Sequence, residues 1–543
     1  MLSILSRIKF HKTWIICGLL LLVALGFRLY IAFRLPNDAP DDGRVYAQIA
    51  RNVLEQHVYS HESQPPYIPS IIRLPGYPSF LAGVYAMSGH GNNRAVRVVQ
   101  GVVDTGTCVL VSLVAFWWMP DDKHKHLAAT MSLALAAVCP FTAIYVATIL
   151  TEVPTSFFAV LACLTATLAF KNSRWSLFLW AVTGIVSGIA VLFRPDSGLF
   201  AVAIGMTLLI SGVVTRAEKH QRKLLRLSKL FASAAMFATA FCIVLIPWAV
   251  RNRRVFHVFQ PLAPAHGEMP GEFVPRGYLL WLRTWVDDER YIAPVLWSLD
   301  SSQIKMESFP DRAFDSDAER DRVALLIQKY DHPADEDENA DDESKDSEEE
   351  SANTQEQSTD QQDDGESESQ EQSEAETGSE QSVEMTPEID EQFAQIARDR
   401  IARSRFRYYL VLPVKRAISL WFDTHSQYFP FEGELFPLDD LDYAIHQQVW
   451  LPLFATLTWI FTILAAIGAW LLWRARTFEA RRWVILVSLI VVLRLGFFST
   501  LENPEPRYVV EIFPFLSILG GIAMAYGVQK LKSAIGNWQS AIT

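Results

Sequence analysis

Two aspartates, Asp41 and Asp42, stand just after the first long apolar run of the 543-residue chain, in the stretch NDAPDDGRVYAQIARN. The helical pattern that follows them is too short and too polar to cross a bilayer. One Asp can cap such a helix, because Asp is a favoured N-cap residue. A cap needs only one Asp, however, and Tyr46 follows one turn later. The pair leaves two interpretations open: a helix cap, or a carboxylate placed to act as a general base.

A further acid, Glu152, opens another apolar run in the stretch TILTEVP. An acid in the first turn of a helix is stabilised by the helix dipole, and Thr151 could cap that helix. The same position would also suit an acid that takes part in catalysis. Asp196 in FRPDSG and Glu505 in NPEPRY are weaker candidates for such a role.

Arginines recur at the ends of the apolar runs and in the loops beside them. The planar fork of Arg binds phosphate oxygens in a bidentate manner, so a group of arginines at one membrane face favours an anionic ligand such as a phosphate. The alternative is that each side chain snorkels to lipid headgroups. The arginines concerned are Arg73, Arg194, Arg251, Arg253, Arg254 and Arg507.

The elements that must position these residues are membrane helices. Half of the residues are hydrophobic and the mean hydropathy is +0.15. The first apolar run, 13–33, is too long for a signal peptide, and we expect it to be retained. The apolar runs predict an all-α polytopic membrane protein of about ten spans. These are 13–33, 95–118, 127–147, 153–170, 176–193, 197–214, 229–250, 450–473, 482–500 and 508–528.

The charged loops orient the spans. With ten spans and the N-terminus inside, the basic loops DDKHKH, KNSR, TRAEKHQRKLLR and RARTFEARR all face the cytoplasm, as the positive-inside rule demands. An eleventh span at 74–87 would reverse this. Residues 34–94 and 251–449 then lie outside, and so do the arginines named above. Within the first outer loop, 43–56 and 77–88 predict helices that lie on the membrane surface.

The net charge of −12 is due to one acidic tract, and the rest of the chain is basic. Residues 331–391 carry a net charge of −25, whereas the rest of the chain is +13. The tract is nearly free of apolar residues and is expected to be a disordered linker. We therefore expect five regions. They are a catalytic transmembrane module at 1–260, an outer loop region at 261–330, the acidic tract at 331–391, an interfacial segment at 392–449, and three C-terminal spans at 450–543.

An ordered series of motifs resembles a known family. The pieces are DDGRVYAQIARNVLE, RLPGYPSFLAGVYAMSG, RAVRVVQ, TEVPTSFFAVL, GIVSGIAVLFRPDSGLF, PWAVRNRRVF and PEPRYVVEIFPFLSILGG. In this order they are similar to the GT-C glycosyltransferases that use polyprenyl-phosphate sugars, the protein O-mannosyltransferase and aminoarabinose transferase group (families 39 and 83). The resemblance covers 13 to about 260 and 450 to 530. It implies a GT-C fold with interfacial helices in the first outer loop.

The resemblance also implies roles for the residues. Asp42, with Asp41 as the neighbouring alternative, would be the base that deprotonates an acceptor hydroxyl in an inverting single displacement. Glu152 would help to orient the acceptor or a bound cation. The residues expected to bind substrate are Tyr46, Arg73, Arg194, Arg251, Arg507 and Tyr508.

The implied partners are a polyprenyl-phosphate sugar, membrane lipid, and a glycan, lipid or protein acceptor; no nucleic acid is expected. No cofactor is certain, and a divalent cation stays open. Asp287, Asp288 and Glu289 could bind one, but a solvated turn is the preferred interpretation of that run. The expected location is the inner (plasma) membrane, with the catalytic face periplasmic.

Two other classes were weighed against a transferase. A lipid or solute transporter or flippase would place charges within its spans near the bilayer midplane. The spans carry few charges, with Arg97, Asp104 and Arg494 as the exceptions recognised from the sequence. A membrane scaffold that binds a partner through the acidic tract would leave the outer arginines unexplained.

Overall fold

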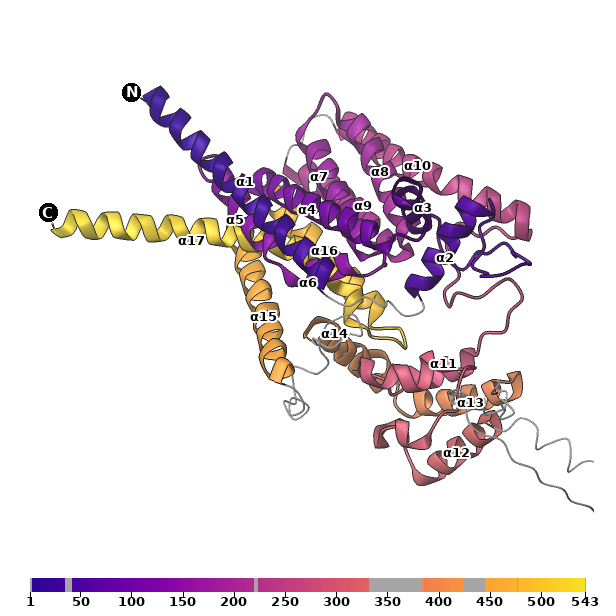
Figure 1. Ribbon diagram of the computed structural model, residues 1–543. Coiled ribbons are helices and arrows are strands. Elements are labelled where there is room, and N and C mark those ends of the chain that lie inside the picture. Colours follow the sequence, from indigo (N-terminus) through magenta and orange to yellow (C-terminus); the bar gives the residue numbers. More distant parts are fainter. Residues whose placement is uncertain are drawn as a thin grey trace, which may run out of the picture. The chain divides into compact units, whose positions relative to one another are not determined.

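The computed structural model describes residues 2–34, 42–218, 223–331, 383, 385–422, 445–475 and 477–542. Within these residues the regular structure is helical throughout (Figure 1). Helix ends follow local signals. Asn92 accepts a hydrogen bond from the backbone N–H of Ala95 and caps α4 (Asn93–Trp118), and Thr477 does the same for α16 (Phe478–Phe498) through Ala480.

Eight of the described helical segments are long and apolar enough to span a membrane. This confirms an all-α polytopic membrane protein. They fall in α1 (Leu2–Arg34), α4, α7 (Glu152–Lys171), α8 (Ser176–Phe193), η2 with α9 (Pro195–Ser197 and Gly198–Glu218), α10 (Lys223–Phe256), α15 (Ile445–Arg474), and η10 with α17 (Pro506–Ile512 and Phe513–Ile542).

Two of the ten expected spans differ from a plain helix. The segment 127–147 consists of α5 (Lys125–Ala137) and the short α6 (Pro140–Ala143) with η1 (Ile144–Ala147), bent by 50°. Pro140 lacks the N–H that would continue α5, which explains the break. The other is α16, whose every 18-residue window holds Arg481, Arg482 and Arg494. The whole helix, at 21 residues, is still long enough to cross a bilayer core, so about ten spans remain plausible.

Close helix packing in this body depends on small residues. Gly184 and Gly188 lie one turn apart on α8, facing α10. A Cβ on Gly184 would come within 2.3 Å of the backbone oxygen of Phe237, and one on Gly188 within 3.0 Å of that of Phe241. Such close approach of two backbones is how membrane helices pack without bulky side chains between them.

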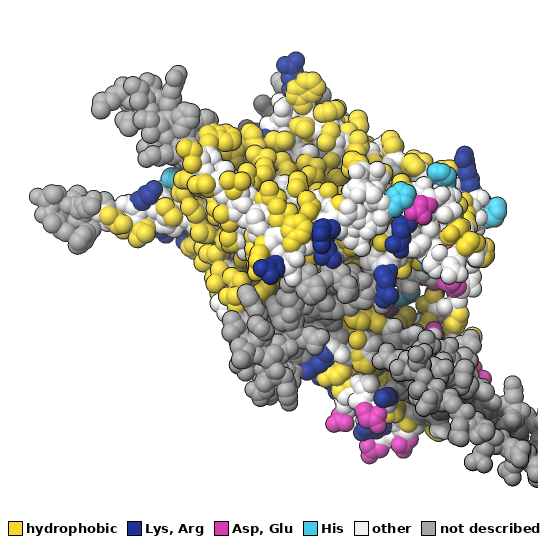
Figure 2. Space-filling model, viewed as in Figure 1, with side chains coloured by type: hydrophobic (Ala, Val, Ile, Leu, Met, Phe, Trp, Pro, Cys, Tyr) yellow, Lys and Arg dark blue, Asp and Glu magenta, His cyan; other side chains and the backbone are white. Residues whose placement is uncertain are grey.

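The outer surface of the helical body suits a lipid environment. Large apolar side chains such as Leu19, Ile243, Trp459 and Trp470 are exposed. Figure 2 shows hydrophobic side chains covering much of the visible face of the helices. In water such a surface would be an aggregation hazard, so its extent agrees with a membrane protein.

The segment expected to be the first outer loop contains two short helices, close to where the sequence pattern predicts them. They are α2 (Asp42–Glu55) and α3 (Gly76–Ser88), and they pack against each other. The ring of Tyr46 meets that of Tyr77 edge to face at 5.1 Å. Tyr77 donates a hydrogen bond to Gln100 on α4, and Gln100 in turn donates to the backbone oxygen of Thr148. This chain of contacts fixes α2 against the transmembrane body.

The described chain divides into two compact units. The larger unit contains the membrane helices, 287–289, and α14 (Leu412–Phe422). The smaller comprises 275–286 and 290–408, with α11 (Arg276–Leu282), α12 (Asp317–Asp331) and α13 (Pro387–Arg403) around buried aromatic rings. The acidic tract is an insertion within the smaller unit, and almost all of it lies outside the described residues. The five regions expected from the sequence remain a prediction.

Candidate active site

Asp42 is held by two arginines at the start of α2. Arg73 donates from Nη2 to Oδ1 of Asp42 at 2.6 Å, and Nη1 of Arg507 lies 3.5 Å from Oδ2. The side chain of Asp42 remains 32% exposed, so a substrate could still reach it. Burial by itself would raise the pKa of Asp42, but the charges of Arg73 and Arg507 outweigh it and lower that pKa. The carboxylate is therefore ionised and doubly paired.

Arg73 is packed on both sides. Its guanidinium lies over the ring of Tyr46, with Cζ 5.7 Å from the centroid, a cation–π contact. On another side the loop at Gly267 approaches so closely that a Cβ there would lie 3.2 Å from Nη1 of Arg73. Gly267 also has φ +74°, which side chains rarely adopt. A glycine at this position lets the loop pack against the arginine.

A second carboxylate contacts Arg507 at Nε, whereas Asp42 lies near Nη1. Its Nε lies 2.6 Å from Oε1 of Glu505, a fully buried side chain. Burial raises the pKa of Glu505 to about 7, although the charge of Arg507 opposes this. The guanidinium of Arg507 also lies over the ring of Tyr508 at 5.4 Å. Arg507 thus bridges Glu505 and Asp42.

A second set of ion pairs surrounds Arg194, at the end of α8. Arg194 donates from Nη1 to Glu152 at 2.7 Å and from Nε to Asp196 at 2.8 Å, and Nη1 is also 3.2 Å from Glu511. Glu152 begins α7, so its position at a helix N-terminus is the one expected from the sequence. The three acids that share Arg194 are all buried or nearly so.

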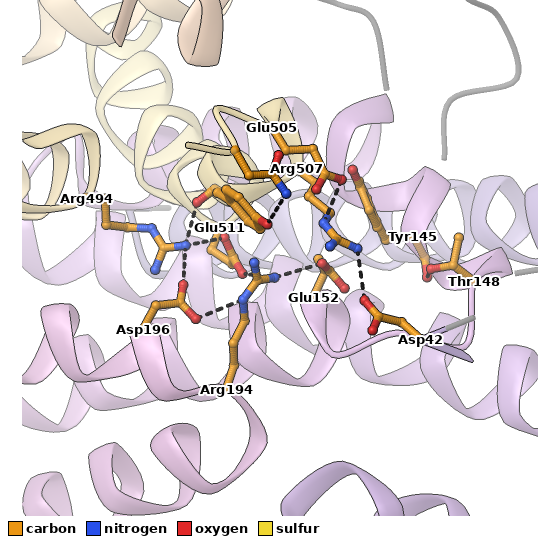
Figure 3. A network of polar contacts seen from close by, with 12 residues as sticks. Asp42, Tyr145, Thr148, Glu152, Arg194, Asp196, Arg494, Glu505, Arg507 and Glu511 are labelled. Atoms are coloured by element: carbon orange, nitrogen blue, oxygen red, sulfur yellow. Dashed lines mark hydrogen bonds and ion pairs between the residues drawn. The ribbon is translucent and has the colours of Figure 1, made fainter. Parts of the chain in front are cut away.

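Arg494 on α16 also belongs to this second set, because it pairs with two of the same acids. Its Nη2 lies 2.9 Å from Asp196 and 2.8 Å from Glu511. Figure 3 shows the resulting network, which runs from Asp42 at one end to Arg494 at the other. We call these side chains, together with Arg73, the charged network; its members are Asp42, Arg73, Glu152, Arg194, Asp196, Arg494, Glu505, Arg507 and Glu511.

The structure brings most of the predicted site residues together and separates others. Asp42, Glu152, Arg73, Arg194 and Arg507 belong to the charged network. Tyr46 and Tyr508 supply aromatic faces to its arginines.

One predicted residue lies elsewhere, and one is not described. Arg251 donates to the backbone oxygen of Ser70 at 2.7 Å and lies over the rings of Tyr59 and Trp248, so it supports the first outer loop and not the carboxylates. Asp41 lies outside the described residues, so the choice between Asp41 and Asp42 rests on the contacts of Asp42 alone.

Some members of the charged network carried only weak signals in the sequence. Asp196 and Glu505 were the weaker candidates, and both are full members. Arg494 was noticed as a charge within a span, without a role. Glu511 was missed, although it follows Arg507 by four residues in RYVVE, a spacing that places both on neighbouring turns.

A metal centre finds no support in the part of the chain that the structure describes. No group of three or more His, Cys, Asp or Glu side chains there is arranged to hold an ion. Asp287, one of the acids considered for a cation, lies 3.5 Å from Nζ of Lys415 instead.

One protein family matches part of the chain. Residues 69–248 match the family described as dolichyl-phosphate-mannose-protein mannosyltransferase. Over these residues, which we call the GT-C segment, the chain is similar to this family of GT-C glycosyltransferases. The match confirms the resemblance drawn from the motifs, for about a third of the chain. This GT-C segment includes Arg73, Glu152 and Arg194, whereas Asp42 and Arg507 lie before and after it.

Solved structures of similar arrangement belong to larger or distant proteins. The archaeal oligosaccharyltransferase AglB from Archaeoglobus fulgidus, in complex with an inhibitory peptide and a dolichol-phosphate, is 12% identical, with 97% of this chain and 52% of that one covered and a TM-score of 0.48. ArnT from Cupriavidus metallidurans bound to undecaprenyl phosphate is 14% identical, with 94% and 78% covered and a TM-score of 0.37.

The chain thus spans about half the length of the oligosaccharyltransferase. Because both TM-scores lie below 0.5, these likenesses carry no argument about activity. No curated protein matches the sequence.

The chemistry open to this site follows from its charges. It offers an ionised, partly exposed carboxylate that can accept a proton, beside two guanidinium groups that can bind an anion. Both functions meet at one point, because the two arginines contact opposite oxygens of the same carboxylate.

Proposed function

We propose that this protein is a membrane glycosyltransferase that moves a sugar from a polyprenyl-phosphate donor to an acceptor hydroxyl. The observation that carries the proposal is the placement of Asp42 between Arg73 and Arg507 at the start of a surface helix. The GT-C segment at 69–248 supplies the reaction class. Dolichyl-phosphate mannose, from which the matching family takes its name, is a polyprenyl-phosphate sugar of this kind.

Donor binding begins with an exchange of partners. The donor is a phosphodiester with one negative charge, and its tail remains in the bilayer. In the free enzyme the guanidinium groups of Arg73 and Arg507 are paired with Asp42. When the donor binds, its phosphate replaces Asp42 as the partner of both groups. Asp42 is thereby released, and its pKa rises toward that of an ordinary carboxylate because its cationic neighbours are now neutralised. A bound donor therefore makes Asp42 a better base.

Transfer is a single displacement. The acceptor oxygen forms a bond to the anomeric carbon while the bond between that carbon and the phosphate oxygen breaks. The acceptor proton passes to Asp42, and polyprenyl phosphate leaves with an additional negative charge. Arg73 and Arg507 stabilise that charge as it develops, which is the largest contribution that such a site can make. The configuration at the anomeric carbon is inverted.

Glu152 is the residue that we assign to the acceptor. Its Oε1 accepts from Arg194, whereas Oε2 is buried and accepts no hydrogen bond from the described residues. A buried carboxylate oxygen without a donor is costly, and an acceptor hydroxyl would satisfy it. Arg194, Tyr46 and Tyr508 line the same region and complete the substrate-binding set. Arg251 acts indirectly, since it holds the first outer loop that carries Arg73.

The reaction is placed on the outer, periplasmic face of the inner membrane. The basic loops favour this orientation by the positive-inside rule, and α2 belongs to the first outer loop. Labelling of single cysteines in a cysteine-free background tests it: a cysteine at position 92 should react with an impermeant reagent in intact cells, and one at 220 should not. Reaction at 220 in intact cells would reverse the orientation.

Release of polyprenyl phosphate is the direct test of the reaction. Purified protein is incubated with a panel of polyprenyl-phosphate sugars and with sugar, lipid and peptide acceptors. We expect one donor to give polyprenyl phosphate in an amount equal to the glycosylated product, and Asp42→Asn to lower the rate of both by roughly 10²-fold or more. Movement of labelled lipid across vesicles without any cleavage would instead support a transporter or flippase.

A further inference from the structure

Glu505 is a buried carboxylate that has one ion-pair partner among the residues that the structure describes. The side chain is fully buried, and its Oε1 lies 2.6 Å from Nε of Arg507. No hydrogen bond from the described residues reaches either of its carboxylate oxygens. A buried charge is costly to keep unless it is paired. The contact with Arg507 is therefore what holds the Glu505 carboxylate in place.

The contact with Glu505 constrains how Arg507 presents its nitrogens. Because Nε is occupied by Glu505, Nη1 points to the opposite side, where it lies 3.5 Å from Asp42. The ring of Tyr508 covers the face of the same guanidinium. A guanidinium tied at Nε and stacked on a ring has few other orientations, and such preorganisation is what makes a charged donor effective.

We propose that Glu505 is the positioning residue of the phosphate site: in its ionised form it orients the guanidinium of Arg507 toward Asp42 and the donor phosphate. The inference rests on the proposed function, because it assigns the phosphate to Arg507. It differs from the roles of the residues that touch the donor, since Glu505 acts only through Arg507.

The charges around Glu505 make this positioning dependent on pH. The charged groups that act on it electrostatically are Arg507 on η10, Glu152 on α7, Arg194 after α8 and Asp42 on α2, and the titratable ring of Tyr508 on η10 interacts with it as well. Burial raises the pKa of Glu505 to about 7. Above pH 7 the carboxylate of Glu505 is ionised, and its negative charge orients Arg507. Below pH 7 the carboxyl group is protonated and no longer carries that charge. Donor binding should accordingly weaken as the pH falls through about 7.

The test is binding of a probe of constant charge. Farnesyl-phosphate mannose is a short-chain phosphodiester that stays singly charged between pH 5.5 and 8.5. Its affinity is measured by tryptophan fluorescence or calorimetry for the wild-type protein and for Glu505→Gln, Glu505→Asp and Glu502→Gln. Glu502 is the matched control, a buried acid in the same loop that lies near His266.

The expected results distinguish two roles of Glu505: orientation of Arg507, and simple repulsion of the anionic probe by its negative charge. Glu505→Gln should bind the probe about tenfold more weakly than wild type at pH 8, the scale of one charged hydrogen bond, and should lose the pH dependence near 7. Glu505→Asp keeps the charge and should keep a pH dependence, with intermediate affinity. Glu502→Gln should behave as wild type. All variants are compared for thermal unfolding in detergent.

Three outcomes would overturn the inference or its basis. If Glu505→Gln binds the probe more tightly at pH 8, Glu505 merely repels the anion and does not position Arg507. If Glu505→Gln binds the probe more weakly but its affinity still changes near pH 7, Glu505 is not the group that titrates, and the weaker binding reflects a general change of structure. If the wild-type protein binds no probe at any pH, the proposed donor is wrong, and the result concerns the proposed function itself.

Discussion

Oδ1 of Asp42 accepts a hydrogen bond of 2.6 Å from Nη2 of Arg73. The carboxylate that we propose as the base therefore occupies the guanidinium that we propose for the phosphate. Without donor, the two groups neutralise each other and the pKa of Asp42 is lowered. A base of lowered pKa is a weak proton acceptor, so the free enzyme is poorly set for deprotonating an acceptor and the donor itself activates it.

This competition predicts an unusual phenotype for Asp42→Asn. Transfer should fall by roughly 10²–10⁴-fold, the range for loss of a general base. Affinity for farnesyl-phosphate mannose should rise or stay level, because the neutral amide no longer competes for Arg73 and Arg507. Kinetics and probe binding are measured on the same preparation. A loss of binding that parallels the loss of transfer would show that Asp42 contributes to holding the donor.

The two arginines should be needed for their shape as well as their charge. Arg73→Ala and Arg507→Ala should each lower kcat/KM by an amount corresponding to about 2–4 kcal/mol, the scale for losing one donor to a developing anion. Lysine at either position should restore only part of this, since it lacks the bidentate fork. Arg253, an exposed arginine whose Nη1 donates to the backbone oxygen of His257, is the matched control.

The alternative to a phosphate clamp is anchoring to lipid headgroups. In that case lysine would serve nearly as well as arginine at 73 and 507, and Arg253→Ala would cost about as much as the other alanine variants. Near-wild-type kcat/KM in Arg73→Ala or Arg507→Ala would remove the clamp from the mechanism.

The sequence predicted the elements better than it predicted the partners within the site. Long apolar runs and short amphipathic stretches are local signals, and α2 and α3 begin within one residue of the positions that the pattern predicts. The pairing of Asp42 with Arg507 is not local, because residues at opposite ends of the chain meet only after the helices pack. Glu511 was missed for this reason, since its partner Arg194 lies on another helix.

Arg28 was also overlooked, for a different reason. It lies inside the first apolar run, where a single charge hardly changes the hydropathy of the stretch. Its significance depends on what surrounds it in three dimensions, which the sequence pattern does not show. Such intramembrane charges are expected to be paired, and Arg28 is.

The acidic tract can be shortened without disturbing the unit that contains it. Its two ends are fixed near each other: Asp331 accepts from the backbone N–H of Ile304, and the N–H of Met385 donates to Asp300, four residues away from Ile304. A short linker can therefore replace 335–382. We expect the expression level and the transfer rate to stay within about twofold of wild type and the Tm to be unchanged, because the tract is nearly free of apolar residues that could pack against the rest of the protein.

A control variant distinguishes the effect of the tract's acidic residues from the effect of its length. In this variant 335–382 is replaced by a Gly/Ser segment of equal length. If both variants express well and lose more than tenfold in transfer, the acidic residues themselves take part in acceptor recruitment. Loss in the shortened variant alone would indicate a spacing requirement.

The buried Arg28 should be essential for more than its ion pair. It donates from Nε to Asp104 at 2.7 Å, and also to the backbone oxygens of Ala136 and Ala137 at 3.0 Å each. Those carbonyls lie at the end of α5, where Pro140 has no N–H to offer the oxygen of Ala136. That oxygen keeps only a longer contact, from the backbone N–H of Cys139 at 3.4 Å. Within the membrane region no water replaces such a partner, so each unsatisfied carbonyl is costly.

A double-mutant cycle distinguishes the two roles of Arg28. Asp104→Leu leaves a buried cation unpaired and should destabilise the protein by about 3–5 kcal/mol. Arg28→Met/Asp104→Leu removes both charges, which in many proteins restores stability. Here it should remain clearly less stable than wild type, because the carbonyl of Ala137 loses its hydrogen bond from Arg28 and that of Ala136 keeps only the longer contact from Cys139. Thermal unfolding in detergent is the measurement, with Arg174→Ala, at an exposed loop position, as the control. A double variant as stable as wild type would show that the ion pair alone accounts for Arg28.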